Sequence, residues 1–365
     1  MSARTLPFAF ALAATIVLAP ASAGAAERTG ANVTRARWLM GTLWTFTATA
    51  APADSAATGR ALDAALDSVA ALERSLSNWS PTSELSRLNA AGTRDTVSQA
   101  LAAVLDSALA LAAETGGAFD PTVEPLTVAW DLRGAGRVPD PGALAAARAR
   151  VGYARVSIAH HGPRSTAAVD LGGGALDLGG IGKGYALDHA AALLAAREVR
   201  GFVLDAGGQR LADANGAAWV AHPLDRDRPA VRVRAPRGSL ATSVQREREL
   251  VVRGRRVGHV LDPRTGEPAP AMASVTVAAP SGTRADALST ALLVLGRDAA
   301  RAWAEAHPAI GVLWIEPRGR AAVVHAWNLE VLELAPDVRN AWNLEVLELA
   351  PDVRTAPVAA RTTRP

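Results

Sequence analysis

The chain has 365 residues, of which 49% are hydrophobic and 20% charged, and its formal net charge at pH 7 is +3. These values are typical of a globular protein with one or two domains. The chain contains no cysteine, which excludes disulfides and a lipid anchor attached through cysteine. Arginine runs interleaved with aromatic residues are also absent from the sequence, so the small positive charge does not indicate nucleic-acid binding.

The first residues have the pattern of a secretory signal peptide. Arg4 precedes an apolar run from Leu6 to Leu18, and the small residues Ala21-Ser22-Ala23 form a cleavage site. The apolar run is too short to span a membrane, and an uncleaved anchor is the alternative interpretation. We therefore expect a soluble, exported, periplasmic protein with a signal peptide over residues 1–25, a catalytic domain over 33–325 and a tail over 326–365.

Strands and amphipathic helices alternate along the mature chain. Apolar residues at helical spacing predict helices over 61–76, 98–115, 143–150, 185–197 and 284–295. β-Branched and aromatic residues between turn signals predict strands over 38–50, 273–279, 309–316 and 321–327, and a strand, glycine turn and strand over 201–213. Four further segments between 231 and 263 predict an antiparallel meander.

The tail contains a duplication. The segment AWNLEVLELAPDVR occurs at 326–339 and again at 341–354. One duplicated segment is not a solenoid, because a solenoid needs several stacked repeats. We expect the two copies to compete for one packing position at a sheet edge, so that one copy docks, the other is loosely held, and residues 355–365 are disordered.

The stretch LDLGGIGKGYALD, residues 176–188, contains Lys183, the only lysine in the sequence. It is not a P-loop, because Asp177 stands where a glycine is required and Gly184 follows the lysine. It also lacks the spacing of a dinucleotide-binding fingerprint. Glycines let the backbone approach a ligand closely, and a compact ammonium group near a helix start can neutralise a phosphate.

Asp286 and Thr290 are four residues apart and lie on one face of a predicted helix. A carboxylate and a hydroxyl are hard oxygen ligands suited to Mg²⁺, which completes its shell with phosphates and water. The alternative is that Asp286 caps this helix and Thr290 packs. A zinc site is not indicated, because the seven histidines lack metal-ligand spacing and cysteine is absent.

Two further segments carry candidate site residues. In GHVLDPRTGEP, His259 can act as a base near neutral pH and Arg264 can pair with a phosphate, although the segment can equally be an ordinary turn. In TGGAFDPTVEPL, Phe119 and Asp120 can present a ring and an acceptor to a heterocycle. The alternative for this pair is a core phenylalanine beside a turn-forming aspartate. No G-x-S-x-G nucleophile motif is present.

In their order along the chain, these segments resemble the ApbE family of FAD:protein FMN transferases. The resemblance covers residues 39–296 and rests on MGT, SNWSPTSELSRLN, GGAFDPTVEPL, DLGGIGKGYALD, DAGG, HVLDPRTG and ADALSTALLVLG. It implies an α+β fold with mixed and antiparallel sheets and packed helices in one compact catalytic unit. It also implies a Mg²⁺-dependent enzyme that splits FAD, attaches FMN through its phosphate to a threonine or serine of a target protein, and releases AMP.

The resemblance further implies roles for single residues. Metal ligands map onto Asp286, Thr290 and the backbone carbonyl of Gly180. Contacts to FAD map onto Met40, Trp79, Ala118, Phe119, Asp120, Asp177, Lys183 and the backbone of Val260, with Arg264 as a further phosphate contact and His259 as the base. Trp79, where relatives often carry tyrosine, is expected to stack on a ring of FAD. The implied acceptor proteins, membrane redox subunits or exported flavoproteins, carry an Asp-x-Ser/Thr-Gly-Ala-Thr/Ser motif.

The sequence departs from the family pattern at two points. Many relatives are lipoproteins, whereas this chain has no cysteine for a lipid, and Gly182 stands where relatives often have alanine. Two other functions stay open at this point. One is a Mg²⁺-dependent FAD pyrophosphatase that uses water in place of a protein hydroxyl, and the other is a non-catalytic periplasmic flavin-binding protein.

Overall fold

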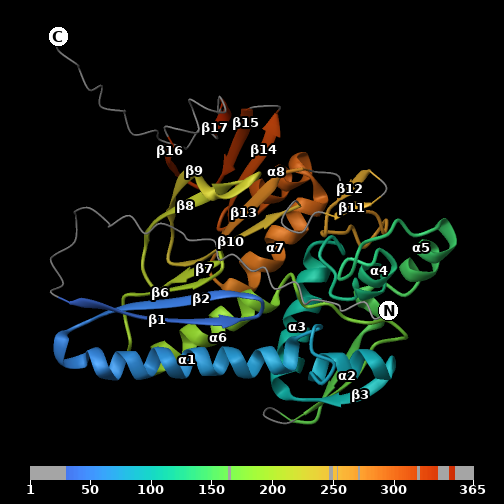
Figure 1. Ribbon diagram of the computed structural model, residues 1–365, viewed down its shortest axis with the longest axis horizontal. Coiled ribbons are helices and arrows are strands. Elements are labelled where there is room, and N and C mark those ends of the chain that lie inside the picture. Colours follow the sequence, from blue (N-terminus) through green and yellow to red (C-terminus); the bar gives the residue numbers. More distant parts are fainter. Residues whose placement is uncertain are drawn as a thin grey trace, which may run out of the picture.

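The computed structural model describes residues 30–162, 166–245, 250–252, 254–269, 272–318, 321–335 and 345–349. The predicted signal peptide and the predicted disordered end of the tail lie outside these residues. The described residues form helices packed on largely antiparallel sheets, which confirms the α+β expectation (Figure 1). None of the helices in the described part of the chain combines the length and apolar character that a membrane crossing needs.

A nine-stranded sheet is the largest element of the fold. Its order is β1 (Ala31–Leu39), β2 (Thr42–Ala50), β6 (Phe202–Ala206), β7 (Arg210–Ala212), β10 (Gly238–Val244), β13 (Ser274–Ala279), β14 (Gly311–Arg318), β15 (Ala321–Trp327) and β17 (Glu345–Leu349). All neighbouring strands pair antiparallel except β15 and β17, which run parallel. Three smaller sheets complete the fold of the described residues. The first contains β16 (Val331–Leu334), β9 (Asp225–Ala235) and β8 (Gly216–His222), in that order. The second contains β3 (Arg94–Val97), β5 (Ala167–Asp170) and β4 (Ser157–His160), and the third contains β11 (Leu250–Val252) and β12 (Arg255–Val257).

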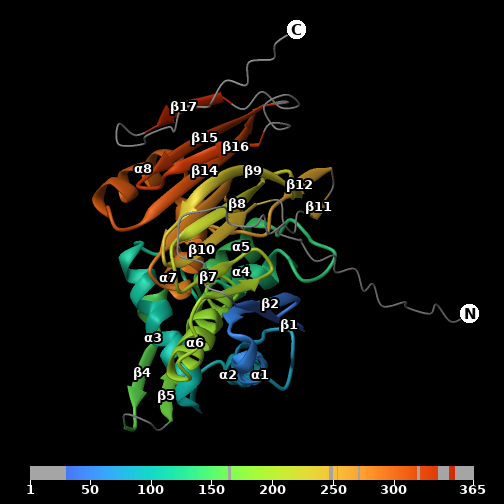
Figure 2. The same ribbon diagram turned by 90° about the vertical axis from the view of Figure 1, so that its left-hand side faces the viewer.

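The helices are α1 (Ser55–Leu76), α2 (Glu84–Ala91), α3 (Gln99–Glu114), α4 (Glu124–Ala129), α5 (Pro141–Arg148), α6 (Gly182–Ala196), α7 (Gly282–Leu295) and α8 (Arg297–Ala306). In Figure 1, α1 runs alongside the hairpin of β1 and β2, and Figure 2 shows α6 beside the same hairpin. Leu62, Leu66 and Val69 on α1 are fully buried or nearly so, as their helical spacing predicts.

The nine-stranded sheet is buried on both faces where it passes through β14. Val312 and Trp314 belong to the core shared with the helices, whereas Leu313 and Ile315 belong to the core shared with β8, β9 and β16. Side chains alternate between the two faces of a strand, so one apolar strand can contribute to both cores. The short sheet of β8, β9 and β16 therefore forms a third layer on the face away from the helices.

The segment predicted as one strand over 38–50 is part of a hairpin. Met40 and Gly41 form its two-residue turn, with φ angles of 47° and 73°, and Leu39 pairs with Thr42. Positive φ at both central residues is the requirement of the turn that best fits the twist of paired strands. The backbone N–H of Met40 donates to Glu73 Oε1 on α1 at 2.8 Å, which fixes this turn against the helix.

The predicted meander between 231 and 263 is wrong. β9 pairs with β8 and β16, whereas β10 pairs with β7 and β13 in the nine-stranded sheet. The segment around Leu261 makes only an isolated bridge to Pro268. The two strands β9 and β10 are consecutive in sequence but enter different layers, which alternation within each strand does not reveal.

Both copies of the duplicated tail segment contribute a strand. The first copy supplies β16, which pairs antiparallel with β9 and buries Val331 and Leu334. The second copy supplies β17, which pairs in parallel with β15 at the end of the nine-stranded sheet (Figure 2). The two copies thus occupy different places, and the expected competition for one packing position does not occur.

Candidate active site

One large cavity lies between the helices and the sheets. Its volume is about 1580 Å³. It is lined by the turn after β1, the loop after α1, the loop after α3, the start of α6, the strands β8 and β10, the segment 259–261 and one face of α7. The site residues predicted from the sequence that line it are Met40, Trp79, Ala118, Phe119, Asp120, Asp177, Gly180, Lys183, His259, Val260, Asp286 and Thr290.

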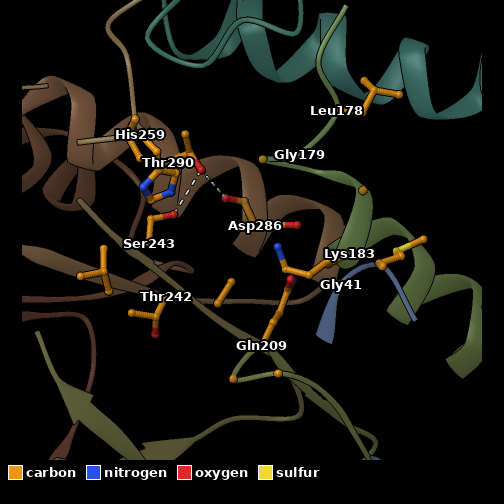
Figure 3. A pocket seen from close by; sticks show the side chains of 18 of the residues that line it. Gly41, Leu178, Gly179, Lys183, Gln209, Thr242, Ser243, His259, Asp286 and Thr290 are labelled. Atoms are coloured by element: carbon orange, nitrogen blue, oxygen red, sulfur yellow. Dashed lines mark hydrogen bonds between the residues drawn. The ribbon is translucent and has the colours of Figure 1, made fainter. Parts of the chain in front are cut away.

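The crossing of α6 and α7 sets the geometry of one wall. A Cβ atom on Gly184 would lie 2.1 Å from the carbonyl oxygen of Gly282, so the helices approach to backbone contact. Asp188 fixes the crossing by accepting the N–H groups of Gly282 at 2.6 Å and Thr283 at 2.8 Å. Lys183 on α6 and Asp286 on α7 are therefore held beside each other in the cavity wall (Figure 3).

Oxygen atoms gather where Asp286, Thr290 and Gly180 meet. Thr290 Oγ1 lies 3.4 Å from the carbonyl oxygen of Asp286, and a Cβ atom on Gly180 would lie 3.2 Å from Thr290 Oγ1. Asp286 Oδ2 accepts the N–H of Gly184 at 3.0 Å. A side chain at position 180 would fill this space, which explains the glycine. A carboxylate, a hydroxyl and a backbone carbonyl are hard-oxygen donors of the kind that suits Mg²⁺.

Ser243 on β10 extends this oxygen cluster. Its Oγ lies 3.2 Å from Thr290 Oγ1 (Figure 3). The same atom lies 2.8 Å from Ser289 Oγ. Sequence reasoning missed Ser243, because it lies more than 40 residues before Thr290 in a segment without a motif. Within the described residues, no group of three or more acidic, histidine or cysteine side chains could hold a metal ion. A metal at this position would therefore be held by fewer than three such side chains of the described residues.

Lys183 and Gln209 present unpaired polar atoms to the cavity. Across the described part of the chain, the Lys183 ammonium has neither a hydrogen-bond acceptor nor an ion-pair partner. Gln209 is buried, and its Nε2 donates to the carbonyl of Gly282 at 3.1 Å, which leaves Oε1 without a partner. Figure 3 shows Gln209 directed toward Lys183. Burying an amide oxygen without a hydrogen bond costs free energy, so this atom is available to a ligand in the cavity. Gln209 was not predicted from the sequence.

The mouth of the cavity carries Trp79, whose side chain is 64% exposed. The guanidinium of Arg133 lies 5.8 Å from the centroid of its ring, within the range of a cation–π contact. Arg133 also pairs with Asp177 at 2.8 Å and with Glu124 at 2.6 Å. Burial raises the pKa of the Glu124 carboxyl, with Arg133 opposing the rise. Arg133, absent from the predicted set, thus connects the predicted ring-stacking residue to Asp177.

Phe119 and Asp120 combine the two interpretations left open by the sequence. Phe119 is buried and its ring lies beside Gly180. The Asp120 carboxylate accepts the N–H groups of Thr122 at 2.8 Å and Tyr153 at 2.9 Å, so it holds its own loop together. Burial raises the pKa of Asp120, and these hydrogen bonds oppose the rise. The side chain of Asp120 is a turn-forming group that also borders the cavity.

A buried glutamine positions His259. Gln245 accepts the N–H of Val260 at 2.9 Å and donates to the carbonyl of Val260 at 3.0 Å, so its side chain clamps the backbone next to the histidine. His259 consequently lines the cavity beside Thr290 (Figure 3). Gln245 could not be found from the sequence, because the segment after it has no recognisable motif.

Arg264 is the predicted site residue that the structure does not bring to the cavity. Its guanidinium pairs with Asp262 at 2.8 Å and 2.9 Å, and its side chain is 43% exposed. The expected contact of Arg264 with a phosphate stays a prediction. An aspartate two residues earlier in the same turn takes up the fork of the guanidinium, which is the ordinary-turn interpretation of this segment.

Comparison with known proteins identifies the family. The model of the ApbE family matches residues 40–314. The chain belongs to the ApbE family. Among curated proteins, it is 33% identical over 276 residues to an FAD:protein FMN transferase of Klebsiella pneumoniae, covering 72% of this chain and 78% of that protein. A protein of the same name from Treponema pallidum is 34% identical over 262 residues, covering 65% of this chain and 72% of the relative.

Solved structures of ApbE proteins share the fold. The ApbE protein of Thermotoga maritima matches with a TM-score of 0.70 and 27% identity, covering 86% of this chain and 99% of that chain. The flavin transferase ApbE from Vibrio cholerae matches with a TM-score of 0.66 and 28% identity, covering 82% and 97%. The ApbE resemblance inferred from the sequence motifs is thereby confirmed. The matched range contains the predicted site residues from Met40 to Thr290.

Proposed function

We propose that this protein is a Mg²⁺-dependent FAD:protein FMN transferase. The observation that carries the proposal is the convergence of Lys183, Asp286, Thr290 and the backbone at Gly180 on one wall of a cavity large enough for a dinucleotide. A diphosphate needs positive charge on its oxygens, and this wall supplies an unpaired ammonium next to a hard-oxygen donor set. The family and the name of its curated members support the same activity.

The reaction forms one phosphoester bond and breaks one bond of the diphosphate. The hydroxyl oxygen of an acceptor serine or threonine attacks the phosphorus on the flavin side. The bond from that phosphorus to the bridging oxygen breaks, and AMP leaves with the bridging oxygen. The hydroxyl proton goes to His259, which borders the cavity near Thr290.

Gly180, Asp286 and Thr290 would hold the metal through a backbone carbonyl, a carboxylate and a hydroxyl. When bound, Mg²⁺ supplies charge that offsets the negative charge developing on the diphosphate oxygens. Lys183 holds those oxygens from the side of α6, where the start of the helix adds a partial positive charge. Lys183 presents a compact ammonium to the cavity, whereas an arginine there would present a wider planar guanidinium.

The residues at the mouth bind the ring systems of FAD in this proposal. Trp79 stacks on a ring from the exposed side, and Arg133 holds Trp79 in place while pairing with Asp177. Phe119 contributes an apolar surface beside Gly180, and Met40 closes the neighbouring wall. The backbone of Val260 offers hydrogen bonds from the segment that Gln245 holds.

A single assay tests this function against the two alternatives. Purified protein is incubated with FAD and MgCl₂, with or without a synthetic peptide carrying an Asp-x-Thr-Gly-Ala-Thr motif. Transfer predicts a fluorescent peptide whose mass has increased by FMN minus one water, together with an equal amount of AMP. Release of FMN and AMP at the same rate without peptide would instead identify a pyrophosphatase. FAD binding without any cleavage would identify a flavin-binding protein.

We also propose that the mature enzyme acts outside the cytoplasm on exported acceptors. The support is the signal-peptide pattern of the first 25 residues, with Arg4, the apolar run and the Ala21-Ser22-Ala23 site. Fractionation of cells expressing the full chain checks the location. Amino-terminal sequencing of the mature protein checks the cleavage site, and an intact amino terminus would contradict it.

A further inference from the structure

β10 has one edge that is only partly paired. On one side it pairs with β13 from Ser239 to Val244, whereas on the other it pairs with the short strand β7 only from Gly238 to Leu240. Within the described residues, the rest of that second edge has no strand partner. Each residue of the unpaired part of the edge, Ala241–Val244, lines the cavity. We call this segment the free edge of β10.

The direction of the main-chain groups on the free edge follows from the register. The N–H of Gln245 donates to the carbonyl oxygen of Ala273, on the β13 side, at 3.5 Å. The main-chain N–H and C=O groups of the odd-numbered residues of β10 therefore point toward β13, and those of the even-numbered residues point to the opposite side. Thr242 and Thr276 are directly opposite each other, and their hydroxyl oxygens are 2.8 Å apart. This short distance is typical of a non-hydrogen-bonded pair in an antiparallel ladder, in which the side chains lie closer together. The N–H and C=O groups of Thr242 and Val244 therefore point to the unpaired side.

The free edge runs past the candidate reaction centre. Ser243 lies between Thr242 and Val244, and its Oγ is 3.2 Å from Thr290 Oγ1. The end of the edge leads into Gln245, whose side chain clamps the backbone next to His259. Figure 3 shows Thr242 and Ser243 following each other along the wall beneath Thr290 and His259. An extended segment paired with this edge would pass beside Thr290 and His259.

The cavity has room for a second reactant at this edge. Its volume of about 1580 Å³ exceeds the roughly 300–1,000 Å³ that is usual for a single small-molecule site. The residues proposed to bind FAD, such as Trp79, Phe119 and Lys183, come from the loop after α1, the loop after α3 and the start of α6. None of these elements belongs to β10. The free edge is thus a part of the lining that offers repeated main-chain donors and acceptors beside Ser243 and that is not assigned to the nucleotide.

We infer that the acceptor polypeptide docks as an added strand on the free edge of β10, an inference that rests on the proposed transferase function. Main-chain hydrogen bonds to Thr242 and Val244 hold the segment, as in other cases of strand addition to an open edge. These bonds are independent of side-chain identity and place the segment beside His259 and Thr290. The occupant is an extended segment of a protein that carries a serine or threonine.

The test uses fluorescein-labelled acceptor peptides carrying an Asp-x-Thr-Gly-Ala-Thr motif, each with one backbone nitrogen methylated at successive positions. N-methylation removes one main-chain donor and adds bulk at that position only. Pairing with one edge predicts that N-methylation matters at every second position of the peptide. At these positions we expect at least a tenfold loss of binding, measured by anisotropy, and of transfer, measured as kcat/KM. Methylation at the positions between them should change both quantities little. A uniform loss, or no loss, at consecutive positions overturns the inference.

Binding and transfer separate this inference from the proposed function. Alternating loss of binding without any flavin transfer supports the docking edge and contradicts the transferase activity. Flavin transfer without alternation supports the activity and overturns the docking edge.

A pair of enzyme variants gives a second reading. Thr242→Pro removes the N–H that faces the unpaired side and places a ring in its position, whereas Thr242→Ala keeps the backbone and removes only the hydroxyl. We expect Thr242→Pro to bind peptide at least tenfold more weakly than Thr242→Ala, with equal FAD affinity and cooperative thermal unfolding in both. Equal peptide affinity in the two folded variants overturns the inference.

Discussion

The backbone N–H of Gly184 on α6 donates to the carboxylate of Asp286 on α7 at 3.0 Å, across a crossing where the two helices touch. This bond joins the helix that carries Lys183 to the helix that carries Thr290. A change in the packing of these two helices would therefore affect the stability of the fold and would also move the Lys183 ammonium relative to Asp286 and Thr290.

Gly184→Ala is expected to destabilise the fold. Its Cβ atom would lie 2.1 Å from Gly282 O and 2.8 Å from Asp286 Cβ, so the helices must separate. Overpacking of this kind costs about 1–3 kcal/mol of unfolding free energy. Urea unfolding measures the change. Gly182→Ala is the matched control, because nothing lies within 4 Å of a Cβ there and the substitution is expected to be neutral or slightly stabilising. Equal stability of the two variants would contradict the tight crossing.

Lys183→Arg is expected to slow FAD turnover by roughly 100-fold, a loss typical of misplaced reacting groups. The guanidinium keeps the charge but not the compact shape, so the diphosphate is held in another position. The unfolding free energy should hardly change, because the Lys183 ammonium makes no hydrogen bond or ion pair within the described residues. Single-turnover assays measure the effect, and a wild-type rate from the folded variant would remove the argument for a compact cation.

Removal of divalent metal is expected to abolish cleavage of FAD. EDTA should stop the reaction and excess MgCl₂ should restore it, because the donor set of Asp286, Thr290 and Gly180 contains hard oxygen atoms. Asp286→Asn can still accept the N–H of Gly184 but carries no charge. Isothermal titration should therefore show weaker Mg²⁺ binding with an unchanged melting temperature. Undiminished activity of the wild-type enzyme in EDTA would count against the metal.

Asp205→Asn is expected to change the pH dependence of stability. Burial raises the pKa of Asp205, so the wild-type protein loses stability as the pH rises and this carboxyl must ionise. One oxygen, Oδ1, accepts the N–H groups of both Gly207 and Gly208, and an asparagine oxygen can keep both bonds. The variant should therefore gain stability relative to wild type as the pH rises above the ordinary pKa of an aspartate. The opposite trend in urea unfolding would mean that attraction to Arg210 outweighs burial.

The sequence predicted the helical parts of the site better than its strand parts. Asp286 and Thr290 could be placed together because a spacing of four puts both on one helix face. Lys183 could be placed near a helix start because glycines precede it, and α6 begins at Gly182. Ser243, Gln209 and Gln245 could not be found in this way. Ser243 and Gln209 reach the cavity from a strand or a strand end, and Gln245 at the end of β10 holds the backbone of Val260 next to His259. Long-range pairing rather than local periodicity sets the position of each.

Local partners and changes of layer are difficult to predict from the sequence. Arg264 was expected to contact a phosphate, and its guanidinium pairs with Asp262, two residues earlier. β9 and β10 looked like neighbours in one meander, but they belong to different sheets. This separation leaves the free edge of β10 facing the cavity.

The most direct measurement of the central claim is the position of the metal and the diphosphate. A crystal grown with FAD and Mn²⁺ in place of Mg²⁺ locates the metal by its anomalous signal. The account predicts a peak within ligand distance of Asp286 and Thr290, with the diphosphate oxygens between that peak and the Lys183 ammonium. A diphosphate bound away from Lys183, or a metal peak away from Asp286 and Thr290, would contradict it.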